Sequence, residues 1–164
     1  MSKRIFHYTV RDRLDSILKE GIRVATANVP PGVTPVVWLS VDPFWSQTAN
    51  KAMMRNGVPV ALDRIGTKEN GGGLLRIEVP EAVAPYTWND YKRMANDPAC
   101  ADLAKTARIA GENPRDWRVS FEPIPPRSFL AVEMMNERDQ WAQIVAPYGS
   151  PLMTYEQLEV DSRS

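Results

Sequence analysis

The chain has 164 residues, of which 43% are hydrophobic and 24% charged, a balance that suits one soluble globular domain with a sizeable core. Twenty basic and twenty acidic residues cancel, so no basic excess indicates nucleic-acid binding, and the single cysteine, Cys100, excludes an internal disulfide framework. No apolar run approaches about 18 residues and no signal-like segment stands out, so we expect a cytoplasmic protein without a membrane span.

Turn-forming residues divide the first half of the chain into short segments. Thr9 offers an N-cap hydroxyl with Asp12 three residues later, and Gly21 is a typical stop for the helix that follows. Residues 63–73 are rich in glycine but lead into a strand, which argues against a P-loop and predicts a mobile loop. The expected elements are a strand over 4–8, a helix from Thr9 to Gly21, a buried strand over 35–40, a helix over 44–54, a strand over 58–62 and a loop over 63–73.

The second half is richer in strands than in helices. The expected elements are a strand over 74–79, two helices within 86–110 that are split near Pro98, strands over 117–122 and 129–135, and a last helix from Glu137 around Trp141. Since strands and helices do not alternate strictly, the sequence predicts an α+β fold with a mainly antiparallel or mixed sheet. We expect one domain over residues 1–155 and a frayed polar tail over 156–164.

A few polar side chains stand where they can form a site. His7 is the only histidine, which excludes multi-histidine metal sites and leaves one side chain that titrates near physiological pH. Glu122 follows Ser120 by two residues on a predicted strand, so both side chains are expected on one face and can line one pocket. Arg76 is the best internal candidate for a phosphate group, because a guanidinium binds phosphate oxygens in a bidentate manner.

Three segments of the chain occur in an order that is typical of a known superfamily. The first is His7-Tyr8-Thr9 with the short helix to Gly21, the second is Val36–Ser40, and the third is Ser120–Glu122 with a proline-rich turn into the strand at Phe129. Together they resemble the ADP-ribosyltransferase superfamily, in particular DarT-like and related NAD-dependent toxin-type enzymes. The resemblance implies split antiparallel or mixed sheets flanked by short helices, with NAD bound in a cleft between two small sheets and no metal.

This chemistry gives each candidate residue a role. Glu122 would stabilise the oxocarbenium-like ribose that forms when the nicotinamide bond breaks, and would activate the acceptor. The other residues would bind NAD: His7 through a ribose hydroxyl, Tyr8 or Trp38 by stacking on nicotinamide, Ser40 through a ribose or amide oxygen, Arg76 through the pyrophosphate, and Thr9 and Ser120 within the same site. The function that the resemblance implies is transfer of ADP-ribose from NAD to a macromolecular acceptor, protein or nucleic acid.

Structural and functional alternatives stay open. The structural ones are His7 and Trp38 as packing residues, Arg76 paired with Glu78, and Glu122 as a solvated residue, with Glu78 or Glu133 as the next carboxylate. Trp45 and Thr48 are expected either to cap the pocket or to pack, and packing is favoured for both. The functional ones are an NAD glycohydrolase, which uses water as the acceptor, and a non-catalytic inhibitor or binding module on the same fold. A toxin, an effector, or an inhibitor in the conflict between a phage or plasmid and its host would fit these alternatives.

Overall fold

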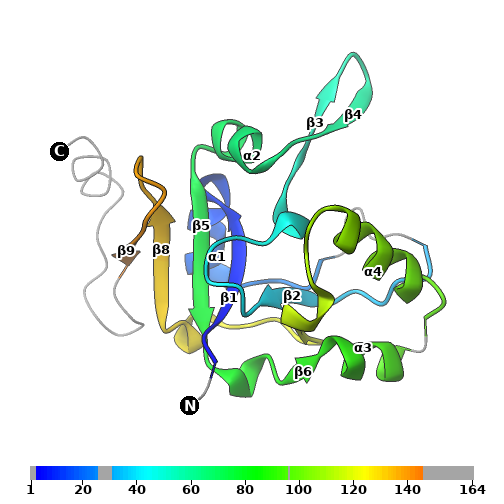
Figure 1. The fold of residues 1–164 in the computed structure, drawn as a ribbon. Coiled ribbons are helices and arrows are strands. Elements are labelled where there is room, and N and C mark those ends of the chain that lie inside the picture. Colours follow the sequence, from blue (N-terminus) through cyan, green and yellow to red (C-terminus); the bar gives the residue numbers. More distant parts are fainter. Residues whose placement is uncertain (1–2, 26–30, 96, 146–164) are drawn as a thin grey trace.

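An antiparallel sheet of seven strands forms the centre of the molecule (Figure 1). The computed structural model describes residues 3–25, 31–95 and 97–145. The strand order is β6-β7-β2-β1-β5-β8-β9, and a separate hairpin is formed by β3 and β4. The strands are β1 (Ile5–Val10), β2 (Val37–Ser40), β3 (Ala52–Arg55), β4 (Val58–Ala61), β5 (Leu74–Val79), β6 (Tyr86–Thr87), β7 (Trp117–Ser120), β8 (Ala131–Met135) and β9 (Trp141–Val145). The α+β class and the antiparallel pairing are as predicted.

Four short α-helices flank the sheet within the described residues. They are α1 (Leu14–Glu20), α2 (Arg64–Gly71), α3 (Trp88–Ala95) and α4 (Cys100–Ile109). None of the described helices is long and apolar enough to cross a membrane. The bounds of α3 and α4 confirm the two helices expected within 86–110, and α1 is capped by Gly21 as predicted.

Alternation along the strands sends side chains to two separate cores. On one face Ile5 and Ile77 pack with Leu14 and Ile17 of α1. On the opposite face Tyr8 packs in a second cluster with other residues of β1, β5 and β8. A third cluster lies under α3 and α4, which cover β2 and β7. The sheet is thus covered on both faces. The candidate site described below lies at β1 and β2, where residues of these three clusters meet.

The register joins β1 and β2 at one point only. Phe6 lies opposite Ser40, and among the described residues this is the single aligned pair of the two strands, whereas all six residues of β1 pair with β5. Beyond that pair β1 and β2 diverge. The seven strands therefore form one continuous sheet that opens locally between β2 and β1.

Two predicted elements in the middle of the chain are wrong. The helix expected over 44–54 is replaced by a three-residue 3-10 turn, Gln47–Ala49, and by strand β3. The reason is the Asn56-Gly57 pair, whose φ angles of 52° and 77° form a tight hairpin turn that pairs β3 with β4. The loop expected over 63–73 is helix α2, because the Asp63 side chain accepts a hydrogen bond from the Gly66 amide at 2.7 Å and caps the helix.

Two further expectations are also wrong. Thr9 is not an N-cap, since β1 continues to Val10 and the Thr9 side chain is buried within the sheet. The helix expected around Trp141 is strand β9, which pairs with β8 through Met135 opposite Trp141. Local helical spacing was outweighed here by the hydrogen bonds that a sheet edge offers. The frayed tail expected over 156–164 lies outside the described residues.

Candidate functional site

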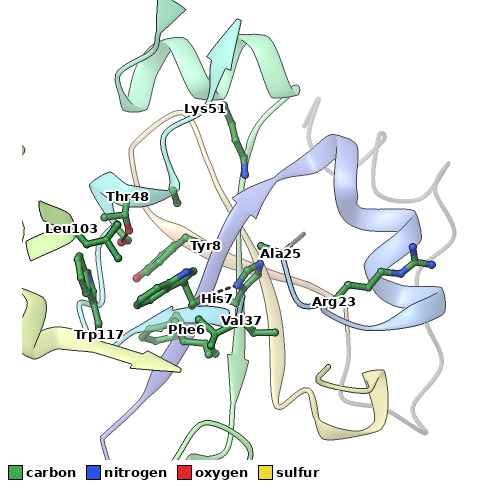
Figure 2. A pocket seen from close by; sticks show the side chains of 15 residues that line it. Phe6, His7, Tyr8, Arg23, Ala25, Val37, Thr48, Lys51, Leu103 and Trp117 are labelled. Carbon is green, nitrogen blue, oxygen red and sulfur yellow. Dashed lines mark hydrogen bonds between the residues drawn. The ribbon is translucent and has the colours of Figure 1, made fainter. Parts of the chain in front are cut away.

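A cavity of about 340 Å³ lies where β1 and β2 diverge (Figure 2). Its volume is within the range of small-molecule sites. One wall is Phe6–Tyr8 of β1, and a second is the stretch from Val36 to Leu39 at β2. The segment between β2 and β3 closes a third side with Ser46, Thr48 and Lys51. The cavity therefore gathers two of the three segments that carried the family resemblance.

His7 is held in one tautomer by the neighbouring strand. Its Nδ1 lies 2.9 Å from the carbonyl oxygen of Trp38. Because a carbonyl can only accept a hydrogen bond, Nδ1 must carry the proton, and Nε2 of the neutral ring is then an acceptor. Burial lowers the pKa of His7 to about 4, and the positive charge of Lys51 acts in the same direction. At neutral pH the cavity wall thus presents an uncharged imidazole with an available lone pair.

Lys51 brings a positive charge to the cavity. Figure 2 shows its side chain pointing from the segment before β3 toward His7 and Tyr8, whereas the Arg23 guanidinium points away from them. Partial desolvation lowers the pKa of Lys51, and the charge of Arg13 adds to this effect. The Arg23 guanidinium is engaged with Glu20. Lys51 as a whole residue is exposed, so an anionic group in the cavity can reach its ammonium and stabilise the charge.

None of the described residues that line the cavity carries a carboxylate. The remaining lining is mostly apolar or hydroxylic, with Ser46 Oγ and Thr48 Oγ1 hydrogen-bonded to each other at 2.8 Å. In the described part of the chain no group of three or more His, Cys, Asp or Glu side chains could hold a metal ion. Arg23 also lines the cavity but is paired with Glu20, so a bound ligand would meet the Lys51 cation, one imidazole, hydroxyl groups and aromatic rings.

Tyr8 and Trp38 both border the cavity, but both are tied into aromatic packing. The Tyr8 hydroxyl donates to the carbonyl oxygen of Asp42, and its ring centroid lies 5.2 Å from that of Trp45. The Trp38 ring centroid lies 5.0 Å from that of Tyr91. These contacts fix both rings, so a ligand would meet preformed surfaces. Of the two residues expected either to cap the pocket or to pack, Thr48 lines the cavity and Trp45 packs in the core.

Five predicted site residues lie outside the cavity lining, among them the buried residues Arg76, Ser40 and Thr9. Arg76 is 5% exposed and forms a bidentate ion pair with Glu133, with Nε–Oε1 at 3.0 Å and Nη2–Oε2 at 3.1 Å. Its ion-pair partner is therefore Glu133 of β8 and not Glu78, which pairs with Arg4. Ser40 and Thr9 are also buried away from the cavity, and Ser40 Oγ accepts a hydrogen bond from a nearby amide.

Ser120 and Glu122 lie beside the cavity wall without lining it. Ser120 Oγ donates to the Glu122 carbonyl at 2.7 Å, which shapes the turn after β7. Ser120 is opposite Val37, and Ile124 bridges Ile22, so Glu122 falls between two segments that contribute to the cavity wall. Glu122 is an exposed residue, which agrees with the alternative of a solvated residue, and its side chain has no hydrogen-bond or ion-pair partner in the described ranges.

Sequence reasoning missed Lys51 as a site residue. Residues 44–54 were interpreted as a helix, and that interpretation gave no reason to place Lys51 beside β1. The available signal was Asn56-Gly57, which is typical of a hairpin turn and would have removed the helix. The chain matches no protein-family model, no curated protein and no solved structure in the comparisons.

Proposed function

We propose that the protein is an NAD-dependent ADP-ribosyltransferase with an ADP-ribosyltransferase-like fold. The observation that carries this proposal is the position of His7, a neutral hydrogen-bond acceptor set in a cavity between two diverging strands. The three segments that resemble the superfamily also support it, because they lie on or directly beside adjacent strands β1, β2 and β7. Neighbouring strands bring distant sequence motifs to one place.

The proposed reaction breaks the bond between nicotinamide and the ribose of NAD. Nicotinamide leaves with the bonding electron pair, and an acceptor X–H forms a bond from X to the ribose carbon while releasing a proton. His7 Nε2 would accept a hydrogen bond from a ribose hydroxyl and orient the sugar. Glu122 would stabilise the developing positive charge and take the acceptor proton. A side-chain rotation of Glu122 toward the wall formed by Val36 and Val37 is required for this role.

Lys51 is the better candidate for the NAD pyrophosphate. Arg76 is already neutralised by Glu133, whereas Lys51 reaches the cavity and has no acidic partner in the described chain. The Lys51 ammonium is a point charge that can contact a phosphate oxygen from the cavity wall. We therefore assign the phosphate contact to Lys51 in place of Arg76.

A second candidate function is a non-catalytic module that binds NAD or a related nucleotide. It is favoured by the absence of a carboxylate among the described cavity-lining residues. Such a module would use His7 and Lys51 for binding and would leave the nicotinamide bond intact. The two functions share one site and differ in whether Glu122 reaches the ribose.

Calorimetry and a label-transfer assay together test these proposals. We expect NAD to bind the wild-type protein, and Lys51→Met to weaken binding at least tenfold. Glu122→Gln is expected to abolish release of nicotinamide without weakening NAD binding, while Glu81→Gln, an exposed control, changes neither. Free ADP-ribose without labelled acceptor would indicate a glycohydrolase. Binding without turnover would indicate the non-catalytic module, and absence of NAD binding would refute both.

A further inference from the structure

The hairpin of β3 and β4 forms an arm that projects from the body of the protein (Figure 1). We use "the arm" for residues 52–61. Its base is anchored by two hydrogen bonds, from the Leu62 amide to the Lys51 carbonyl at 2.9 Å and from the Lys51 amide to Thr67 Oγ1 at 2.9 Å. Thr67 is fully buried. The arm therefore starts directly at the cavity, since Lys51 lines it, and rises from a fixed base.

The surface of the arm is apolar and almost uncharged. Arg55 is its single charged residue. Met54 is 64% exposed and Val58 is 59% exposed. The register places four exposed apolar residues on one face of the arm: Ala52, Met54, Pro59 and Ala61. Solvated hairpins of this kind usually carry charged side chains, so an apolar surface of this sort indicates contact with another molecule.

One edge of the arm offers free main-chain groups and the other does not. In a hairpin with a two-residue turn, the pair that flanks the turn, here Arg55 and Val58, is hydrogen-bonded, and the next pair is not. The amide and carbonyl of Met54 therefore point outward from β3. On β4 the residue opposite is Pro59, which has no amide proton, so that edge lacks an outward donor at this position. Strand addition is thus favoured at β3 only.

We propose that the open edge of β3 binds an extended, uncharged segment of a protein acceptor as an added strand. This inference rests on the proposed transferase function and names its acceptor class. An added strand obtains affinity from main-chain hydrogen bonds and packs apolar side chains against Met54. A strand that follows β3 toward its base leads to Lys51 and the cavity mouth. Nucleic acid is disfavoured, because the arm has one positive charge with which to neutralise phosphates.

The test uses a defined peptide probe and two matched variants. The probe is a fluorescent eight-residue peptide of alternating threonine and valine that ends in serine, measured by anisotropy. We expect Met54→Lys to weaken binding at least tenfold, because a charge on an edge strand opposes pairing. Met94→Lys on α3, also a substitution at an exposed methionine, should change binding by less than twofold. The same peptide N-methylated at alternate residues, which removes its amide donors, should not bind.

Several results would overturn this inference. These are equal binding by wild type and Met54→Lys, full binding of the N-methylated peptide, and no binding of the peptide at millimolar concentration. Binding of a single-stranded oligothymidine in its place would assign the arm to nucleic acid. A dimer that Met54→Lys abolishes, without peptide binding, would assign the edge to a second copy of the chain. NAD calorimetry on Met54→Lys separates the two proposals, because the arm variant should bind NAD as wild type does even if peptide binding is lost.

Discussion

Replacing His7 with asparagine tests the electrostatic description of the cavity. The asparagine amide can donate to the Trp38 carbonyl in place of Nδ1, but it has no group that titrates between pH 4 and 7. In the folded protein the pKa of His7 is lowered to about 4, against an ordinary value of 6.5. The unfolded chain therefore binds a proton more readily than the folded chain in this window, and folding becomes less favourable as pH falls.

The expected size follows from this difference in pKa. Stability from the neutral ring is fully present above pH 6.5 and is lost as pH falls toward 4. Linkage gives a loss of about 2 kcal/mol at pH 5 and about 3 kcal/mol at pH 4, relative to neutral pH. These are upper values, because the His7 ring is in part reached by solvent and a cavity that admits water lowers the cost of the charge.

Urea denaturation at pH 7.5, 6, 5 and 4.5 measures this effect. The free energy of unfolding of wild type should fall more steeply with decreasing pH than that of His7→Asn, with the two curves separating below pH 6.5. Carboxylates titrate in both proteins, so their contribution cancels in the difference. Parallel curves for the two proteins would refute the assignment of a desolvated, neutral His7. A difference that grows above pH 7 would contradict the sign.

Three further substitutions have expected outcomes. Arg76→Ala leaves the buried carboxylate of Glu133 with only the exposed Arg4 guanidinium, 3.6 Å away, and should cost about 3 kcal/mol in urea unfolding. Arg76→Met with Glu133→Leu should recover most of this loss, and an unchanged midpoint for the single variant would contradict the buried pair. Gly21→Ala should cost about 3 kcal/mol, because its φ is 83° and a Cβ would lie 2.2 Å from the Ile124 carbonyl oxygen. Gly111→Ala has a similar φ of 86° but open space around it, so it should cost about 1 kcal/mol, and equal losses at both glycines would show that the close contact is unimportant.

Most regular elements of the sheet could be predicted from the sequence because their signals are local. The strand over Leu74–Val79 is a dense run of apolar and β-branched residues that ends at a proline, and it is observed with those bounds. The order of His7, Val36–Ser40 and Ser120–Glu122 along the chain led to the family resemblance. These residues lie on or directly beside β1, β2 and β7, which are neighbours in the sheet.

The failures arose where local spacing competed with long-range pairing. The segment over 44–54 has helical spacing, but a strand partner supplied by the Asn56-Gly57 turn determines its structure. The tail around Trp141 is a strand because β8 has an open edge beside it. Such hydrogen bonds depend on a partner elsewhere in the chain, and no window of sequence contains them.

The sequence by itself determined the class of the fold and pointed to the single imidazole, His7, with its neighbours in the strand. Only the tertiary structure decided which charge faces His7. Arg76 and Lys51 are both cations within apolar surroundings in the sequence, but Glu133 lies across β5 and β8 from Arg76 and neutralises it, whereas Lys51 extends into the cavity. Electrostatic energy depends on distances between atoms, and those distances are set by the register of strands that are far apart in the chain.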